Sequence, residues 1–280
     1  MNFTKVQGAG NDFVLIEADN LEKDWANITR MVCDRHFSVG GDGLLVVMPS
    51  RKADIRMRIF NLDGSEADAC GNGLRCVVRY AIERGLVKSG VGQLTVETMA
   101  GVRQVRLGHG KKPVIQVFMG KPAFEAKSIP MTIPQNNGLK PITDYPVKVG
   151  DREVRLNCVS MGNPHAVFFI REKPADFPLL QIGPAVEKNR LFPKAVNFEV
   201  AHVLDRKHIE ARVWERGVGE TLACGSGACA ISVMAWLRGV IDDKVDITLP
   251  GGILNVEWDG AGEVLLSGPA EIVFTGTWPD

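Results

Sequence analysis

The sequence predicts an α/β (α+β) protein of two pseudo-symmetric, homologous domains, each a mixed, mostly antiparallel sheet curled around a central helix. Three observations lead to this prediction. A segment that opens with Cys-Gly-x-Gly occurs twice, the residues after each copy follow a helical spacing, and much of the remaining chain reads as short strands. At 280 residues the chain is long enough for two domains of the usual size, about 100 to 200 residues each.

The duplication covers more than the cysteine motif. Residues 69–85, ACGNGLRCVVRYAIERG, align with residues 223–239, ACGSGACAISVMAWLRG, at an offset of 154 positions (224 − 70). Two further pairs of segments match in the same order: RIFNLDGSE with RVWERGVGE, and GNDFVLIE with GNPHAVFFI. A repeated order of three matching segments indicates two homologous halves.

Helices are expected directly after both cysteine motifs. The first has the i, i+3, i+4, i+7, i+8 apolar spacing of an amphipathic helix, carried by Leu74, Val77, Val78, Ala81 and Ile82, and Gly85 favours its end. The second, residues 226–238, is apolar on almost every face and should therefore be buried.

Strands and a linker account for most of the rest. IRMRI alternates, QLTVETM and VRQVRL follow it, and LNVEWDGAGEVLLSG has Asp-Gly in a turn between two strand patterns. The Pro-rich residues 121–146 are the expected linker. We expect an N-terminal half at residues 1–120 carrying Cys70, completed by C-terminal strands at 263–280, and a C-terminal half at 121–262 carrying Cys224.

Composition excludes several classes of partner and site. Thirty-three basic and thirty-three acidic side chains cancel, so no overall field would attract nucleic acid or an anionic membrane, and a small molecule is the expected ligand. The N-terminus lacks a secretion signal and no apolar run would span a membrane, which predicts a cytoplasmic protein. The six cysteines are expected to be thiols, and their spacing does not fit a structural zinc site.

Cysteines at the start of two helices suggest proton-transfer chemistry. Unpaired backbone N–H groups and the positive end of the helix dipole favour a thiolate there, and the same amides can bind a carboxylate. Two such helices converging on one carboxylate would place Cys70 and Cys224 on opposite faces of its α-carbon. One thiolate would remove the α-hydrogen while the other thiol returns one from behind, inverting the centre without a cofactor.

The residues also carry a family resemblance. QGAGNDFV, FNLDGSEADACGNGLRC, SMGNPHAV, VNF and WERGVGETLACGSGAC resemble diaminopimelate epimerase, essentially from end to end. The resemblance implies the two-domain fold, Cys70 and Cys224 as acid and base, no cofactor or metal, and a homodimer. It also implies interconversion of LL- and meso-diaminopimelate for lysine and peptidoglycan synthesis.

The same resemblance implies roles for further residues. His165 and Glu215 resemble residues that tune the thiols, and Arg216 is suited to a two-point grip on the distal carboxylate. The expected substrate contacts are Asn11, Asn61, Gly71, Asn72, Asn163, Asn197, Glu215, Arg216, Gly225 and Ser226. One departure is Gly43, where some family members carry Gln, so a substrate contact at that position is open.

Other interpretations stay open at this point. Cys33, Cys76, Cys158 and Cys229 lack the duplicated glycine motif and are expected to serve packing. The asparagines could be turn formers, His165 could be a strand-end residue bonded to a main-chain carbonyl, and Glu215-Arg216 could be a solvated pair. Alternative functions are a proline, hydroxyproline or histidine racemase of the same architecture, a thiol-switch module, and an amino-acid binding protein.

Overall fold

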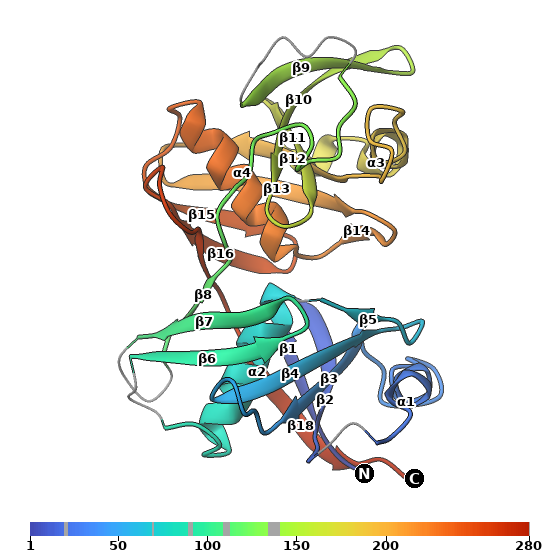
Figure 1. Ribbon diagram of the computed structural model, residues 1–280. Helices are drawn as coiled ribbons and strands as arrows, with labels where there is room; N and C mark the ends of the chain where they lie inside the picture. The colour runs from blue at the N-terminus through green and yellow to red at the C-terminus, as the bar shows by residue number, and fades with distance from the viewer. Residues whose placement is uncertain (20–21, 69, 89–91, 109–112, 134–140, 280) are drawn as a thin grey trace. The chain divides into compact units, whose positions relative to one another are not determined.

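Two compact units make up the chain (Figure 1). The structure is a computed structural model that describes residues 1–19, 22–68, 70–88, 92–108, 113–133 and 141–279. Unit 1 comprises Met1–Phe118 and Ser267–Asp280, and unit 2 comprises Met119–Leu266. The predicted division into homologous domains at 1–120 with 263–280 and at 121–262 stays a prediction.

Unit 1 is a mixed sheet whose first strand comes from the end of the chain. Its strands are β1 (Asn2–Gly8), β2 (Asn11–Glu17), β3 (Gly43–Met48), β4 (Ile55–Asn61), β5 (Glu66–Ala67), β6 (Gln93–Thr98), β7 (Gly101–Leu107), β8 (Ile115–Phe118) and β18 (Glu271–Thr277). The sheet order is β18-β1-β2-β3-β4-β6-β7-β8, with β5 as a short addition to β4. The pairs β2–β3 and β4–β6 are parallel and the others are antiparallel.

Unit 2 repeats this series of pairings. Its strands are β9 (Ile142–Val149), β10 (Arg152–Ser160), β11 (Pro164–Ile170), β12 (Asn197–Val203), β13 (His208–Glu215), β14 (Gly219–Thr221), β15 (Lys244–Leu249) and β16 (Gly252–Glu257), and β17 (Leu265–Ser267) spans the boundary between the two units in the chain. The order β9-β10-β11-β12-β13-β15-β16 has parallel pairs at β11–β12 and β13–β15, the same places as in unit 1. The predicted mixed, mostly antiparallel α+β fold is confirmed.

A central helix packs against the sheet of each unit. In unit 1, α2 (Gly71–Glu83) contacts β1, β2, β3, β4, β8 and β18. In unit 2, α4 (Gly225–Leu237) contacts β10, β11, β12, β15 and β16, and ten of its residues are buried. Both helices were predicted, as was the burial of the second. Gly85 after α2 has a φ of +70°, a conformation that glycine adopts without strain.

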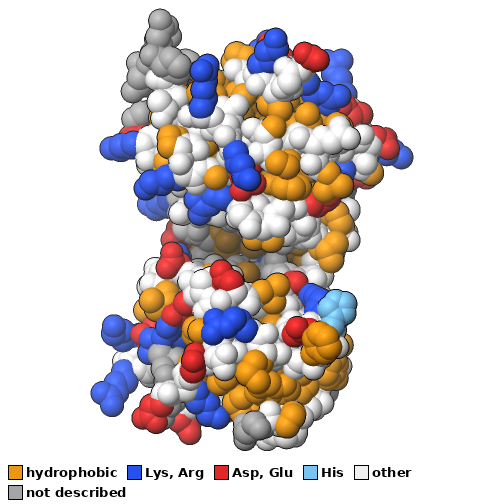
Figure 2. All heavy atoms as spheres, turned by 90° about the vertical axis from the view of Figure 1, so that its right-hand side faces the viewer, with side chains coloured by type: hydrophobic (Ala, Val, Ile, Leu, Met, Phe, Trp, Pro, Cys, Tyr) orange, Lys and Arg blue, Asp and Glu red, His pale blue; other side chains and the backbone are white. Residues whose placement is uncertain are grey.

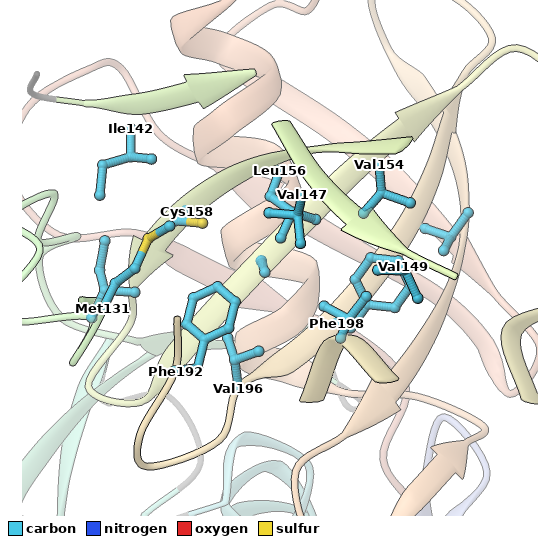
Figure 3. Close-up of a cluster of buried hydrophobic side chains, with 14 of the residues drawn as sticks. Met131, Ile142, Val147, Val149, Val154, Leu156, Cys158, Phe192, Val196 and Phe198 are labelled. Carbon is cyan, nitrogen blue, oxygen red and sulfur yellow. The ribbon is translucent and has the colours of Figure 1, made fainter. Parts of the chain in front are cut away.

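Smaller helices complete both units, and a buried apolar cluster lies in unit 2. Unit 1 has α1 (Trp25–Val32), and unit 2 has the 3₁₀ turn η1 (Pro174–Asp176) and α3 (Leu179–Glu187). In unit 2, the side chains of Val147, Leu156 and Phe198 belong to one buried cluster, formed by β9, β10, β12 and their connections (Figure 3). This cluster holds β12 in the core.

The linker prediction is wrong in part. Residues 134–140 lie outside the described residues, but Ile142–Val149 forms β9, which pairs with β10. β9 accommodates Pro146 because a strand at the edge of a sheet can do without one N–H donor.

The described surface agrees with the balanced charge of the sequence. Basic and acidic side chains are interspersed over the face drawn in Figure 2. No helix among the described residues has both the length and the apolar character needed to cross a membrane.

Candidate active site

Cys70 caps the first turn of α2. Its backbone is extended, with φ −145° and ψ 120°, and its Sγ accepts a hydrogen bond from the Gly73 N–H at 3.4 Å. The thiol lies 3.9 Å from Oδ1 of Asn11, the first residue of β2. The same oxygen accepts a hydrogen bond from Asn72 Nδ2 at 3.5 Å. Asn11, Cys70, Gly71 and Asn72, all predicted site residues, therefore lie together.

Arg75 supports this first turn, and no sequence pattern singled it out. Its side chain is wholly buried, and it donates to Oδ1 of Asn72 at 2.9 Å and to the carbonyl of Gly71 at 3.3 Å. A buried guanidinium needs such partners. Arg75 therefore fixes Asn72 and places a positive charge in the first turn of α2.

Cys224 caps α4 in the same way. Its φ of −119° and ψ of 116° are again extended, and Sγ accepts a hydrogen bond from the Gly227 N–H at 3.4 Å. The Ser226 hydroxyl lies 3.5 Å from the sulfur. Unlike Cys70, which is half-buried, Cys224 is only 6% exposed. The two motifs thus form the same local structure with different access to solvent.

A chain of polar side chains leads from Ser226 into the core of unit 2. Asn163 donates to Ser226 Oγ at 3.3 Å, and Oδ1 of the same amide lies 2.9 Å from His165 Nε2. His165 Nδ1 lies 2.7 Å from Oε1 of Glu199. His165 and Glu199 are wholly buried. The structure thus joins the predicted residues Asn163, His165 and Ser226, and it adds Glu199.

Sequence reasoning missed Glu199, although a signal was present. It is the one charged residue in VNFEVA (196–201), a run that is apolar apart from it and Asn197. Phe198 and Val200 are buried on one face of β12, and Asn197 and Ala201 are buried on the face of Glu199, so the strand has no solvent-facing side on which a carboxylate would lie. A charged residue inside a strand buried on both faces indicates a polar partner in the core.

Burial raises the pKa of the Cys224 thiol well above its ordinary value. The negative charges of Glu215 and Glu199 raise it further, whereas hydrogen bonds from Ser226 and the Gly227 N–H lower it. The expectation that a helix N-terminus favours a thiolate is therefore not met at Cys224. Loss of solvation outweighs the helix dipole at a buried sulfur.

The end of β13 brings three more predicted residues close together. Asn197 Oδ1 accepts a hydrogen bond from the Arg216 N–H at 2.9 Å, and its amide donates to the carbonyl of Pro164 at 2.8 Å. Arg216 Nη1 donates to the carbonyl of Lys194 at 3.2 Å. Glu215 Oε1 accepts from the Thr221 hydroxyl at 2.6 Å. Asn197 therefore orders the turn that carries Arg216.

The remaining positions lie at strand ends of unit 1. Asn61 ends β4, where its side chain is exposed and donates to Ser65 Oγ at 3.0 Å. Gly43 begins β3 opposite Asn61, and a Cβ placed there would lie 2.5 Å from the carbonyl oxygen of Phe60. This backbone therefore admits no side chain at residue 43.

The two units contain the same local structure around a cysteine, and the whole chain is similar in sequence to one protein family. The family model for diaminopimelate epimerase matches residues 3–125 and 157–273. A diaminopimelate epimerase of Moorella thermoacetica is 45% identical over 284 aligned positions, covering 100% of this chain and 99% of that protein. This chain belongs to the diaminopimelate epimerase family. It is therefore an isomerase, as the resemblance predicted.

A further relative agrees with this assignment, and solved structures share the fold. The diaminopimelate epimerase of Acetivibrio thermocellus is 43% identical over 99% of this chain and 98% of that protein. A Bacillus anthracis phenazine biosynthesis protein of the PhzF family shares the fold, with a TM-score of 0.69, 19% identity and coverage of 99% and 98%. A probable proline racemase from Agrobacterium radiobacter has a TM-score of 0.69 at 14% identity, covering 99% of this chain and 92% of that one.

Proposed function

We propose that this enzyme interconverts LL- and meso-diaminopimelate by passing protons through Cys70 and Cys224. The observation that carries the proposal is the repeated thiol geometry, in which each sulfur caps a central helix and accepts a Gly N–H at 3.4 Å. Family membership and full-length relatives named diaminopimelate epimerase support the substrate.

The reaction balances with two thiols and no other reagent. A thiolate takes the α-hydrogen as a proton, becoming a thiol, and the electron pair of the broken C–H bond spreads onto the substrate carboxylate. The second thiol gives its proton to the opposite face of the α-carbon and is left as a thiolate. The centre is inverted, and the two sulfurs have exchanged protonation states. The proposal requires both sulfurs to reach one α-carbon when substrate is bound.

Backbone amides at the two helix starts would stabilise the transition state. The N–H groups of Gly71, Asn72, Gly225 and Ser226 belong to the first turns of α2 and α4, where intrahelical partners are lacking. Such donors act where the charge on the carboxylate increases during proton removal. Losing one comparable donor costs about 2.7 to 4 kcal/mol of activation free energy.

The protonation state of Cys224 fits the role of proton donor. Its raised pKa keeps it a thiol at neutral pH before substrate binds. A buried thiol can give up its proton once a carbanion forms beside it. His165 and Glu215, which act on this sulfur through Ser226 and through charge, are proposed to tune it.

Selectivity for diaminopimelate is assigned to groups that could bind its second amino-acid head group. Arg216 is proposed for the distal carboxylate, and Glu215 with Asn61 and Asn197 for the distal ammonium and its surroundings. Asn11 and Asn163 are proposed to contact the reacting end. A proline, hydroxyproline or histidine racemase would have no use for a second carboxylate grip.

We further propose the biological setting that the family implies. The enzyme would act in the cytoplasm as a homodimer, without pyridoxal phosphate, in the supply of lysine and peptidoglycan precursors. Size measurement by light scattering tests the dimer, and activity after extensive dialysis with no absorbance of a bound pyridoxal group tests the absence of that cofactor.

Isotope exchange tests the reaction directly. LL-diaminopimelate is incubated in deuterated buffer with wild type, Cys70→Ser and Cys224→Ser. The expected result is α-deuterium at an inverted centre for wild type and no epimerisation by either variant. Parallel assays with proline and histidine identify the alternative substrates, and turnover that depends on a reversible Cys70–Cys224 disulfide would identify a redox protein instead.

A further inference from the structure

The polar chain behind Cys224 begins at a carboxyl group that the proposed reaction does not use. Glu199 has 0% exposure, lies in the middle of β12 and contacts His165 through Oε1. Its other oxygen, Oε2, has no hydrogen-bond partner in the described part of the chain. An ionised carboxylate is strongly destabilised in such a place unless both of its oxygens have partners.

The amide of Asn163 defines the direction of the two hydrogen bonds that it makes in this chain. Its Nδ2 donates to Ser226, so its Oδ1 must accept from His165 Nε2. With Ser226 Oγ already accepting, the Ser226 hydroxyl can direct its own hydrogen to Cys224 Sγ. When the hydroxyl has that orientation, each link donates toward the sulfur, and the series depends on a proton at Nε2 of His165.

We infer that Glu199 is a positioning residue that holds the proton of His165 on Nε2 and thereby keeps Ser226 donating to Cys224. The inference rests on the proposed function of Cys224 as a proton carrier. Glu199 would be neutral and donate its O–H to Nδ1 of His165, as a group that sets a histidine tautomer from behind. Without the carboxyl group of Glu199, the proton of the His165 imidazole can move from Nε2 to Nδ1. The series of hydrogen bonds then no longer donates to the sulfur of Cys224.

The groups around Glu199 support a neutral carboxyl. Burial raises its pKa, and the negative charge of Glu215 on β13 raises it further, while His165 on β11 and the Ala166 N–H lower it. Cys224 on α4 and Cys158 on β10 are close enough for the charge of Glu199 to raise their pKa values. A carboxylate and a thiolate in one buried cluster would repel, so a protonated Glu199 is compatible with a thiolate at Cys224.

Unit 1 shows that the fold itself does not need a carboxyl at this position. The residue two places into β3 from Gly43 is Leu45, just as Glu199 follows Asn197 in β12. A Cβ on Gly73 would lie 3.0 Å from Leu45, and a Cβ on Gly227 would lie 3.1 Å from Glu199 Oε1. Leu45 and Glu199 therefore occupy matching places beneath the two cysteine-capped turns.

Three variants separate positioning from mere packing. In Glu199→Gln the side-chain amide can still donate to His165 Nδ1, so the chain keeps its direction. In Glu199→Leu no side chain at residue 199 can bond to Nδ1, so the His165 tautomer with its proton on Nε2 is no longer favoured. The double variant His165→Phe/Glu199→Leu places in unit 2 the residue types that unit 1 has at the matching positions, Phe13 and Leu45. Because both polar partners are removed together, no buried polar group is left unpaired, and the variant is expected to fold. Glu257→Gln, whose side chain pairs with Lys244, is the matched control.

Two readouts are used, one of which is independent of turnover. The thiolate absorbance of each substrate-free variant is titrated against pH, with its Cys224→Ser counterpart subtracted, and the pH profile of kcat/KM is measured with LL-diaminopimelate. We expect Glu199→Leu and the double variant to titrate at higher pH and to lose about ten- to hundredfold in kcat, as when a partner fixing a histidine tautomer is removed. Glu199→Gln should keep the wild-type titration and most of kcat.

The outcomes distinguish this inference from the proposed function. Titrations that coincide in wild type and Glu199→Leu would overturn the positioning role, and so would a downward shift in both Glu199 variants, which would indicate a charged Glu199. Wild type that fails to epimerise while the Cys224 titration still responds to Glu199→Leu would overturn the proposed function alone.

Discussion

The two cysteine-capped turns are built alike and surrounded differently. In both units the sulfur accepts a Gly N–H at 3.4 Å from an extended cap residue. Behind Cys70 the strands supply apolar Phe13 and Leu45, and the charged group is Arg75 on the helix. Behind Cys224 the strands supply His165 and Glu199, and the position matching Arg75 on the helix is Cys229.

This difference shows how a duplicated fold can give one chemical group two environments. A base and an acid are needed at the same moment, so identical surroundings for the two thiols would serve neither role well. A positive charge favours a thiolate, whereas burial and negative charge favour a thiol. Unit 1 has the guanidinium of Arg75, whereas in unit 2 the sulfur is more deeply buried and lies near the negative charge of Glu215.

Transferring the carboxyl to unit 1 should have the largest effect. Leu45→Glu puts a buried carboxyl beneath Gly73 with Phe13, rather than histidine, in the matching strand position. An unpaired buried carboxyl costs several kcal/mol, so we expect the free energy of unfolding to fall by about 3 to 5 kcal/mol. Urea unfolding measures this, with Leu45→Met as the volume-conserving control. Wild-type stability would show that unit 1 has an unsuspected polar partner for the new side chain.

Breaking the pair in unit 2 should cost less than that transfer. His165→Phe alone leaves Glu199 buried without its imidazole, and we expect a loss of about 2 to 3 kcal/mol because the carboxyl can remain protonated. The double variant with Glu199→Leu should regain most of this stability, since no polar group is left without a partner. Thermal unfolding of the two variants checks this order of stability. A double variant that is less stable than His165→Phe would contradict it.

Adding one methyl group to each cysteine-capped turn should destabilise the turn of unit 2 more than that of unit 1. Gly227→Ala places Cβ 3.1 Å from Glu199 Oε1 and 3.4 Å from Cys224 Sγ, whereas Gly73→Ala meets the end of the Leu45 side chain at 3.0 Å. A leucine end can shift more easily than a hydrogen-bonded carboxyl. We expect losses of about 1 to 3 kcal/mol for Gly227→Ala and smaller losses for Gly73→Ala, measured by urea unfolding.

Alkylation should reveal the smallest difference. Because Cys224 is buried and its pKa is raised, its reaction with iodoacetamide should be slow at pH 7 and accelerate as pH rises above its ordinary pKa. The half-buried Cys70 should react first at neutral pH. Peptide mapping after timed labelling gives both rates, with Cys158, wholly buried and of raised pKa, as the internal control. Faster labelling of Cys224 at pH 7 would contradict the contrast.

The sequence predicted what short-range patterns determine. The two central helices follow from apolar spacing and from a cysteine followed by Gly-x-Gly, and the structure places them at Gly71–Glu83 and Gly225–Leu237. The duplicated order of segments predicted the repeated sheet. The helix signals lie within about fifteen residues of chain, whereas the duplication is found by comparing segments 154 positions apart.

Features that depend on packing were not predicted. β9 contains Asp144, with a φ of +49°, and Pro146, which together resemble a linker more than a strand. The raised pKa of Cys224 depends on burial by strands far away in sequence, which an argument from the helix dipole leaves out. The role proposed for Glu199 depends on its contact with His165, which β11 places beside it.

The origin of β18 has a consequence for synthesis. In unit 1 the strand paired with the outer side of β1 is Glu271–Thr277, whereas in unit 2 the corresponding strand, β9, directly precedes β10 in the chain. A ribosome therefore releases every strand of unit 2 described here before it releases the last strand of unit 1. The half whose synthesis begins first is the half completed last, and the edge of β1 stays exposed to other chains until β18 has been synthesised.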